Sequence, residues 1–226
     1  MKDREPTVRS RELGEGLRLA MERAGINGSQ AAHHLDINHE AKAVTIFEFG
    51  STVVPGLLQT GDYARAVISC IATVPADEVD ARVAARLARQ RLLSRDRPPR
   101  LTFYVHEFVL RLPVGGPAVM AYQLDHLQRL SLRPHVALRV VPAALGAHAG
   151  TAGSFTLMEF AGFKPVAYME SETSSLFLET PAEIEAYQRV LAALAETALG
   201  EEESRELIAS LAIELHANRK DHDDRA

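Results

Sequence analysis

Three acidic residues stand at the ends of predicted strands, where a carboxylate can take part in acid–base chemistry. Glu107 follows the apolar alternation of RLTFYVH, Glu170 follows PVAYM, and Glu179 follows SLFL. Alternate side chains of a strand share a face, so each acid continues a row of apolar or aromatic residues. A carboxylate whose pKa is raised by an apolar wall can exchange a proton with a substrate when a histidine lies beside it. Glu107, His148 and Glu170 are therefore the candidate catalytic residues.

A structural explanation of the same acids stays open. Acidic side chains are rarely buried, and acids at strand ends usually lie in solvent. In that case the strand ends before Glu107, and this residue opens a helical turn. The sequence does not determine which strand ends meet. A catalytic site for cyclisation, addition or isomerisation and a set of surface acids are both compatible with it.

A glycine-rich loop, LGAHAGTAGSF at 145–155, lies between two predicted strands. Glycines at this density allow backbone amides to approach a ligand, although they also suit a flexible connection. The sequence contains neither GxGxxG nor GxxxxGK[ST], and its histidines and acids lack the spacing of a metal site. We therefore expect no cofactor and no metal. The candidate ligand contacts are Tyr104, His106, Ser154, Phe155, Tyr168 and Glu179.

The segment 82–100 is strongly basic and contains one acid, Asp96. A helix would place Arg82, Arg86 and Arg89 on one face, from which they can approach a phosphate backbone or an anionic ligand. The alternative is a solvated helix face whose arginine stems cover the edge of the core. No aromatic residues are interleaved as single-strand binding would need. The full set is Arg82, Arg86, Arg89, Arg91, Arg95, Arg97 and Arg100.

The composition indicates a globular protein with a substantial core. The chain has 226 residues, of which 46% are hydrophobic, and its net charge of -5 disfavours nucleic-acid binding over the whole surface. A single cysteine, Cys70, excludes an intramolecular disulfide. No apolar run approaches the roughly 20 residues that span a bilayer. The charged N-terminus MKDREPTVRSRE also lacks the apolar stretch of a signal peptide. We expect a cytoplasmic protein without a membrane partner.

Hydrophobic periodicity predicts an α+β fold. Helical spacing of apolar residues occurs at 62–72, 76–94 and 117–130, and again in two helices that close the chain around 184–194 and 207–215. Short strands are predicted at RLTFYVH, VALRVV, SFTLMEF, PVAYMES and SLFLE. Because crossover helices are few, we expect these five strands to form a small mixed or antiparallel sheet packed with helices.

The N-terminal segment RELGEGLRLAMERAGINGSQAAHHLDI, residues 11–37, resembles helices one and two of an XRE-type (lambda-repressor-like) helix-turn-helix domain. In that family a third helix enters the major groove and reads the bases. Here the chain continues directly from Ile37 into NHEAKAVTIFEFG, without that helix or the two scaffold helices behind it. Residues 1–37 are therefore interpreted as the remnant of a helix-turn-helix domain.

A second resemblance covers residues from about Glu40 to about Ile208. The motifs HEAKAVTIFEFGSTVVPGLLQTGDYARAVI, RLTFYVHEFVLRLPVGGPAVMAYQLDHL, VALRVVPAALGAHAGTAGSFTLMEF and ETPAEIEAYQRVLAAL are similar, in that order, to the poorly characterised domain that follows XRE modules in many bacterial regulators. The resemblance implies a transcriptional regulator with a C-terminal domain that binds an effector or a partner. The expected organisation is a remnant at 1–37, an effector domain at 38–217 and a mobile tail at 218–226.

Three functions follow as expectations. The first is a regulator-like protein that has lost DNA reading and binds a small apolar metabolite or a small protein partner. The second is an enzyme of specialised metabolism, a cofactor-independent cyclase or isomerase recruited from the same ligand-binding domain. The third keeps DNA binding through dimerisation or through the arginines at 82–100. The sequence leaves the ligand, the reaction and the oligomeric state open, a homodimer included.

Overall fold

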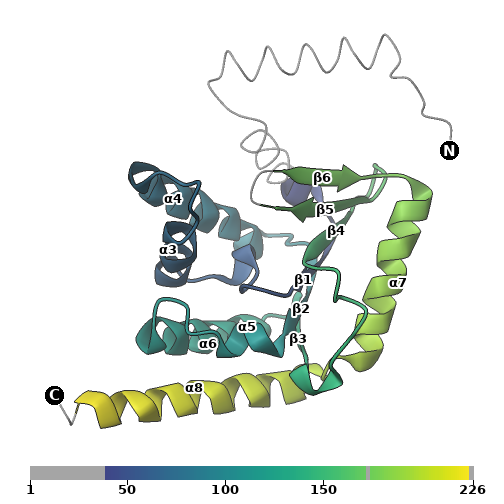
Figure 1. The fold of residues 1–226 in the computed structure, drawn as a ribbon. Coiled ribbons are helices and arrows are strands. Elements are labelled where there is room, and N and C mark those ends of the chain that lie inside the picture. The colour runs from purple at the N-terminus through teal and green to yellow at the C-terminus, as the bar shows by residue number, and fades with distance from the viewer. Residues whose placement is uncertain (1–38, 172–173, 224–226) are drawn as a thin grey trace.

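The computed structural model describes residues 39–171 and 174–223 and arranges them around one mixed β-sheet (Figure 1). The predicted helix-turn-helix remnant, 1–37, lies outside the described residues. The strands are β1 (Thr45–Gly50), β2 (Arg100–His106), β3 (Val136–Val141), β4 (Phe155–Glu159), β5 (Val166–Glu170) and β6 (Ser175–Leu178). The helices are α3 (Gly61–Ser69), α4 (Val79–Arg89), α5 (Glu107–Arg111), α6 (Pro117–Ser131), α7 (Pro181–Thr197) and α8 (Glu201–Asp223). Short 3₁₀ turns include η1 (Gly56–Leu58) and η3 (Gln90–Ser94).

The sheet has the strand order β3-β2-β1-β4-β5-β6. Strands β1, β2 and β3 are parallel, whereas β1–β4, β4–β5 and β5–β6 pair antiparallel. The predicted α+β class with a mixed sheet is confirmed. The predicted number of five strands is wrong, because TIFEFG forms the additional strand β1 between the parallel and antiparallel halves.

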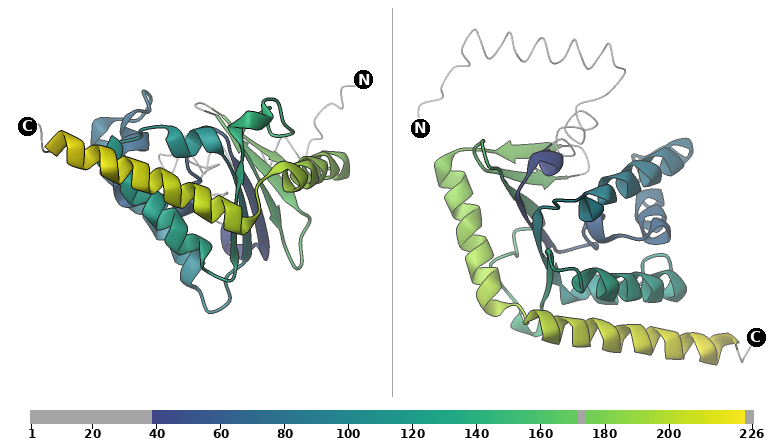
Figure 2. Two further views of the ribbon diagram at one scale, coloured as in Figure 1. Left: turned by 90° about the horizontal axis from the view of Figure 1, so that it is seen from below. Right: turned by 180° about the vertical axis from the view of Figure 1, so that it is seen from behind.

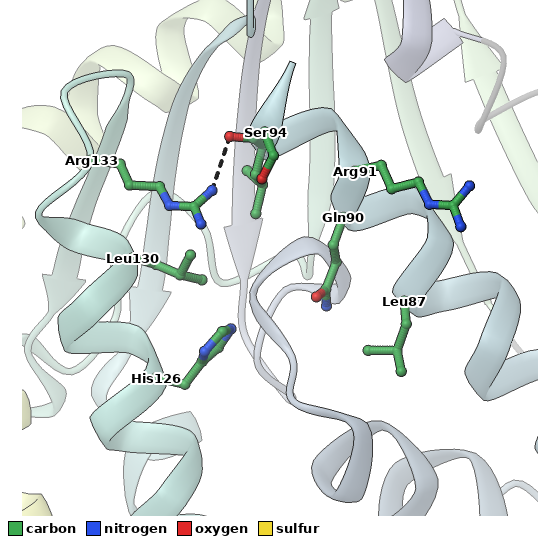
Figure 3. Close-up of a pocket in the computed structure, with 8 residues that line it drawn as sticks. Leu87, Gln90, Arg91, Ser94, His126, Leu130 and Arg133 are labelled. Carbon is green, nitrogen blue, oxygen red and sulfur yellow. Dashed lines mark hydrogen bonds between the residues drawn. The ribbon is translucent and has the colours of Figure 1, made fainter. Parts of the chain in front are cut away.

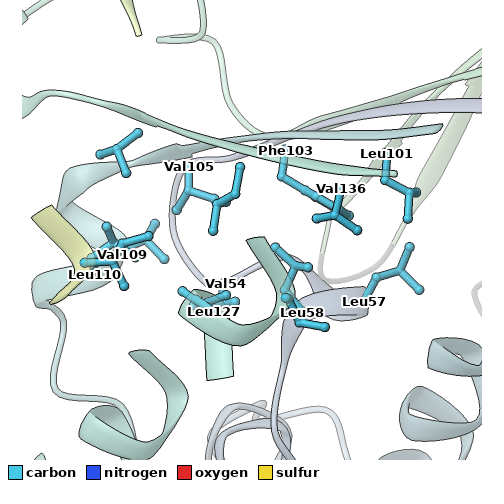
Figure 4. Close-up of a cluster of buried hydrophobic side chains, with 14 of the residues drawn as sticks. Val54, Leu57, Leu58, Leu101, Phe103, Val105, Val109, Leu110, Leu127 and Val136 are labelled. Atoms are coloured by element: carbon cyan, nitrogen blue, oxygen red, sulfur yellow. The ribbon is translucent and has the colours of Figure 1, made fainter. Parts of the chain in front are cut away.

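Helices cover the two faces of the sheet unequally. Figures 1 and 2 show α3, α4, α5, α6 and α8 on one side of the sheet and α7 alone on the other. On the first side, Leu57 and Leu58 of η1 and Leu127 of α6 belong to the same buried cluster as Phe103 and Val105 of β2 (Figure 4). The second side has a smaller cluster, in which Phe49, Phe155 and Leu157 pack with Ile184, Leu191 and Leu194 of α7.

Local sequence signals explain where the helices begin. The Thr180 hydroxyl and the Glu183 carboxylate form a capping box at the start of α7. Pro117 occupies the first turn of α6, where its missing N–H costs no hydrogen bond. The helix α8 continues to Asp223, so its backbone extends into the stretch 218–226 that was predicted as a mobile tail. No helix in the described part of the chain is long and apolar enough to cross a membrane.

A buried glutamine joins α6 to the turn before α3. Gln123 is fully buried, and its side-chain oxygen accepts a hydrogen bond from the backbone N–H of Thr60 at 2.7 Å. Its side-chain nitrogen donates to the backbone oxygen of Leu58, also at 2.7 Å. Both backbone groups would otherwise be unsatisfied in the core, so this one side chain fixes η1 and the start of α3 against the helix layer.

Candidate functional site

Most of the sequence-predicted site residues gather where the three parallel strands end. The carboxyl ends of β1, β2 and β3 lie at one edge of the sheet, and the amino end of β4 joins them because β4 is antiparallel to β1. Ligand sites in sheets with parallel strands commonly form at this edge. The residues that meet there are His106, Glu107, His148, Ser154 and Phe155, named here the strand-end cluster.

Two histidine rings stack within this cluster. The rings of His106 and His148 are 5.2 Å apart and inclined by 22°, and the ring of Phe49 meets His148 edge-on at 5.6 Å. Nδ1 of His106 accepts a hydrogen bond from the N–H of Phe108, and Nδ1 of His148 accepts one from Gly150. Because Nδ1 is the acceptor, each neutral ring carries its proton on Nε2. Burial, with a smaller contribution from His106, lowers the pKa of His148 and keeps it in this neutral form.

Glu107 opens α5 immediately after β2, pairs with the last residue of that helix and holds the segment after β3 in place. One carboxylate oxygen accepts a hydrogen bond from Arg111 at 2.8 Å, and the other accepts one from the backbone N–H of Ala143 at 3.0 Å. The hydrogen bond from Ala143 is the largest cause of a lowered pKa at Glu107, and Arg111 lowers this pKa further. Glu107 is therefore a stable carboxylate at neutral pH. A general acid would need the opposite direction of shift.

Ser154 and Phe155 anchor the glycine-rich loop to the sheet. The hydroxyl of Ser154 accepts a hydrogen bond from the N–H of Ser51 and lies 2.9 Å from the Ser51 hydroxyl. The ring of Phe155 is buried and lies 4.7 Å from the ring of Tyr187 on α7. Tyr104 is also buried, on the same face of the sheet, with the guanidinium of Arg139 5.7 Å from its ring centre. These side chains position the loop and pack the core.

The three acids identified from the sequence do not meet. Glu170 closes β5, which runs in the same direction as β1, so Glu107 and Glu170 lie at the same edge of the sheet. Three strand spacings separate β2 from β5, a distance of about 14 Å. Glu179 follows Leu178, which pairs with Ala167 at the other end of β5. Glu179 therefore lies at the opposite edge of the sheet.

Tyr168 and Glu170 belong to a second group, on the face that carries most of the helices. The registers place Glu48 of β1, Thr156 of β4, Tyr168 of β5 and Phe177 of β6 side by side on four neighbouring strands. Alternation puts Glu170 on the same face, two residues beyond Tyr168. This group is named here the acid–aromatic face, defined as Glu48, Thr156, Tyr168, Glu170 and Phe177.

The acid–aromatic face differs from the rest of the same sheet side in its exposure. Ile46, Phe103 and Val105, on the parallel strands, are at most 1% exposed beneath the helices. By contrast, Glu48, Thr156 and Phe177 are half-buried and Glu170 is exposed. Among the described elements, the main helix packed on β5 is α7, which lies on the opposite face. The antiparallel half of this side is therefore partly open around Glu48, Thr156, Glu170 and Phe177, whereas Met158 and Tyr168 in the same half are buried.

Arg86 on α4 supplies the positive charge at this face. Its guanidinium donates to the side-chain oxygen of Gln59 at 3.0 Å and lies within electrostatic range of Glu170 and Glu48. Burial is the main cause that lowers the pKa of Arg86, while the two carboxylates raise it. The guanidinium remains charged at physiological pH. One cation thus lies within electrostatic range of two carboxylates that come from different strands.

Aromatic rings border these charges. The rings of Tyr168 and Phe177 are 4.8 Å apart, and His39 lies 5.6 Å from Phe177 and 5.9 Å from Phe160. Aromatic walls with a few converging polar groups are typical of sites for small organic molecules. In the described part of the chain, no group of three or more histidine, cysteine or acidic residues is placed to hold a metal ion.

Several arginine side chains of the basic segment 82–100 bind acceptors within the protein. Arg82 pairs with Glu78, Arg89 with Glu40, and Arg95 donates to the backbone oxygen of Ala41. Together with Arg86, these residues are therefore engaged by the protein's own acceptors.

Sequence reasoning missed Glu48, although a signal was present. In TIFEFG, the residues Ile46, Glu48 and Gly50 share one face, so a carboxylate interrupts an otherwise apolar row in the middle of a strand. The proximity of this carboxylate to Arg86 carried no signal, since it depends on how α4 docks.

The fold and its polar groups define an α+β protein built on one mixed sheet, with candidate binding groups at the strand ends and on one half of one face. A family model described as "Domain of unknown function (DUF5753)" matches residues 34–210, and the chain belongs to this family. Comparisons with curated proteins and with solved structures gave no match.

Proposed function

We propose that this chain is a regulator-like protein whose effector domain binds a small, largely apolar molecule at the acid–aromatic face. The observation that supports this proposal is the position of Arg86 opposite Glu48 and Glu170, beside the rings of Tyr168 and Phe177. Glu48 and Arg86 are both half-buried, and a charge that is partly removed from water is costly unless an opposite charge or a hydrogen bond compensates for it.

The chemistry of this face indicates the kind of ligand. The half-buried ring of Phe177, packed against the buried ring of Tyr168, suits an apolar body. The carboxylates of Glu48 and Glu170 accept hydrogen bonds from hydroxyl or amine groups, and Arg86 donates to a carbonyl oxygen. The ligand we propose is therefore an apolar molecule with a few hydroxyl, amine or carbonyl groups. A small protein partner would be the alternative occupant.

The regulator assignment rests on the resemblance of residues 11–37 to the first two helices of an XRE-type domain. We propose that the chain does not read DNA by itself, since the sequence lacks a third helix. The engagement of Arg82, Arg86, Arg89 and Arg95 by internal partners supports this proposal, because these arginines are less available to phosphates. Gel-shift assays across salt concentrations test the point. Tight, sequence-selective binding by the purified chain would contradict it.

Ligand binding can be tested by a thermal-shift screen of apolar metabolites that carry hydroxyl, amine or carbonyl groups, followed by calorimetry of each hit. We expect Arg86→Met and Glu48→Gln to weaken binding of a true ligand at least tenfold. Glu185→Gln, on the far side of the sheet, is the matched control because Glu185 is exposed and pairs with Arg189 of the same helix. A screen without hits, or hits that the two substitutions leave unchanged, would count against the proposal.

An enzymatic role is the second candidate, and the same geometry favours it. Glu48 and Glu170 come from different strands and lie within electrostatic range of one arginine, so one carboxylate can act as a base while the arginine orients the substrate. The proposed reaction is a cofactor-independent cyclisation, addition or isomerisation in specialised metabolism. Each ligand found in the screen should be incubated with the protein and followed by mass spectrometry or chromatography. We expect Glu170→Gln to slow any turnover by about 100-fold or more, while Glu107→Gln has little effect. If no hit is converted, the enzymatic role is wrong.

A further inference from the structure

A pocket lies between α4, η3 and α6, away from the acid–aromatic face. Its volume is about 420 Å³, which is within the range of sites for small organic molecules. Figure 3 shows Leu87 and Gln90 on one side of the pocket and His126 and Leu130 of α6 on the other. Arg133 enters from the end of α6, with Ser94 of η3 opposite it.

The charge of this pocket is entirely positive. Arg91 and Arg133 line it, and none of its lining residues is acidic. The guanidinium of Arg133 is held in place by a hydrogen bond of 2.9 Å to the backbone oxygen of Leu93, which leaves its remaining N–H groups able to meet a ligand. Arg91 points away from Arg133 at the far rim, so it contributes to the field without converging on the same point (Figure 3).

His126 supplies a polar atom that the described residues do not satisfy. Its Nε2 is buried and has no hydrogen-bond partner in the described part of the chain, whereas buried polar atoms are nearly always paired. Burial, together with the positive charges of Arg129 and Arg133, lowers the pKa of His126. An anion beside Arg133 would offer this nitrogen an acceptor and would offset the positive charges of Arg129 and Arg133.

Part of the pocket lining is apolar. Leu87, Leu93 and Leu130 line it together with the cationic groups. A bare inorganic anion would leave these leucines without contact, and a neutral hydrocarbon would leave Arg133 and His126 without a partner. The combination fits a molecule that has an anionic group at one end and a short apolar chain at the other.

We propose that this pocket binds a small organic carboxylate, with the carboxylate at Arg133 and His126 and its apolar chain on Leu87, Leu93 and Leu130. This site is distinct from the acid–aromatic face, because none of its lining residues belongs to that face and it has the opposite charge. It gives the domain a second ligand class, which is recognised by charge as well as by apolar contact.

The test is a two-dimensional NMR titration of the full chain with hexanoate, and with 1-hexanol and hexylammonium as matched probes. We expect hexanoate to shift the amide signals of residues around 126–133, and both other probes to bind at least tenfold more weakly. Arg133→Gln should weaken hexanoate binding tenfold or more. Arg97→Gln removes the same charge from an exposed residue outside the pocket and should leave the affinity unchanged.

A second substitution separates ligand binding from the structural role of Arg133. Since Arg133 also holds the backbone of Leu93, its replacement can disturb the fold. His126→Leu breaks no hydrogen bond found among the described residues and should also weaken hexanoate binding. Equal binding of hexanoate and hexylammonium, or hexanoate binding that both substitutions leave intact, would overturn the proposal. So would a complete lack of hexanoate binding.

Discussion

Arg89 and Glu40 form a buried, bidentate ion pair that joins the end of α4 to the residues just before β1. Nε of Arg89 lies 3.0 Å from one carboxylate oxygen, and Nη2 contacts the other. The two side chains are only 12% and 6% exposed. This pair fixes α4 beside the antiparallel half of the sheet, and α4 in turn carries Arg86 to the acid–aromatic face.

Breaking this pair should destabilise the fold strongly. Glu40→Gln leaves the guanidinium of Arg89 buried without its counter-charge, and we expect a loss of about 3–5 kcal/mol in the free energy of unfolding. The measurement is urea denaturation followed by circular dichroism. Glu78→Gln is the matched control, because Glu78 pairs with Arg82 at about half exposure and should lose at most about 1 kcal/mol. Equal losses in the two variants would contradict the prediction.

Gln123 should be as important to the core as a large apolar residue. Gln123→Leu keeps the volume but leaves the N–H of Thr60 and the oxygen of Leu58 unsatisfied. At about 1–3 kcal/mol for each buried group, we expect a total loss of roughly 2–6 kcal/mol. Gln188→Leu on the exposed side of α7 provides the comparison and should be nearly neutral. Similar unfolding midpoints for wild type and Gln123→Leu would show that the two hydrogen bonds of Gln123 are dispensable for stability.

Gly150 is required by the close approach of Phe49. A Cβ at position 150 would lie 2.7 Å from Cζ of Phe49, well inside van der Waals contact. Gly150→Ala should therefore cost about 1–3 kcal/mol and displace the loop that carries His148. Gly162→Ala meets nothing within 4 Å and should have little effect. Thermal unfolding measures the cost, and loss of the ring-current shift between His106 and His148 would report the displacement.

The titration of His126 should be visible in the pH dependence of stability. Because burial lowers its pKa in the folded protein, the unfolded chain binds the proton more readily. The free energy of unfolding should then fall as pH drops below the ordinary histidine value of about 6.5, until the folded pKa is passed. His126→Leu should make this fall smaller between pH 7 and pH 5. An unchanged slope would contradict the lowered pKa, which NMR of the ring protons can also measure directly.

The sequence predicted the local elements well, because their signals are local. Pro117 and Thr180 mark the starts of α6 and α7, and the alternation of RLTFYVH marks β2. The strand β1 was missed, since Glu48 interrupts its apolar alternation and a six-residue strand offers few positions to compensate. Sequence reasoning thus failed at the strand that carries a candidate functional residue.

The candidate site was less predictable, because it depends on contacts between distant segments. The meeting of His106 with His148 requires the ends of β2 and of the glycine-rich loop to converge, which follows from the strand order. One error was avoidable. Only four residues separate Glu170 from Ser175, a connection that permits an antiparallel hairpin and no parallel crossover. The sequence therefore already placed Glu179 at the opposite edge from Glu170.

The central position of β1 has a consequence for how the chain reaches its native state. Thr45 pairs with Arg100 on one side and with Glu159 on the other. The strand β1 can therefore form its hydrogen bonds only after β2 and β4, which lie much later in the sequence, have been synthesised. Such non-local pairing slows folding, because the entropy of closing long loops is lost before any contact compensates for it. During synthesis, β1 leaves the ribosome with both edges unpaired. A chain that stalls or is cut before Glu159 therefore exposes an open strand edge, which favours aggregation.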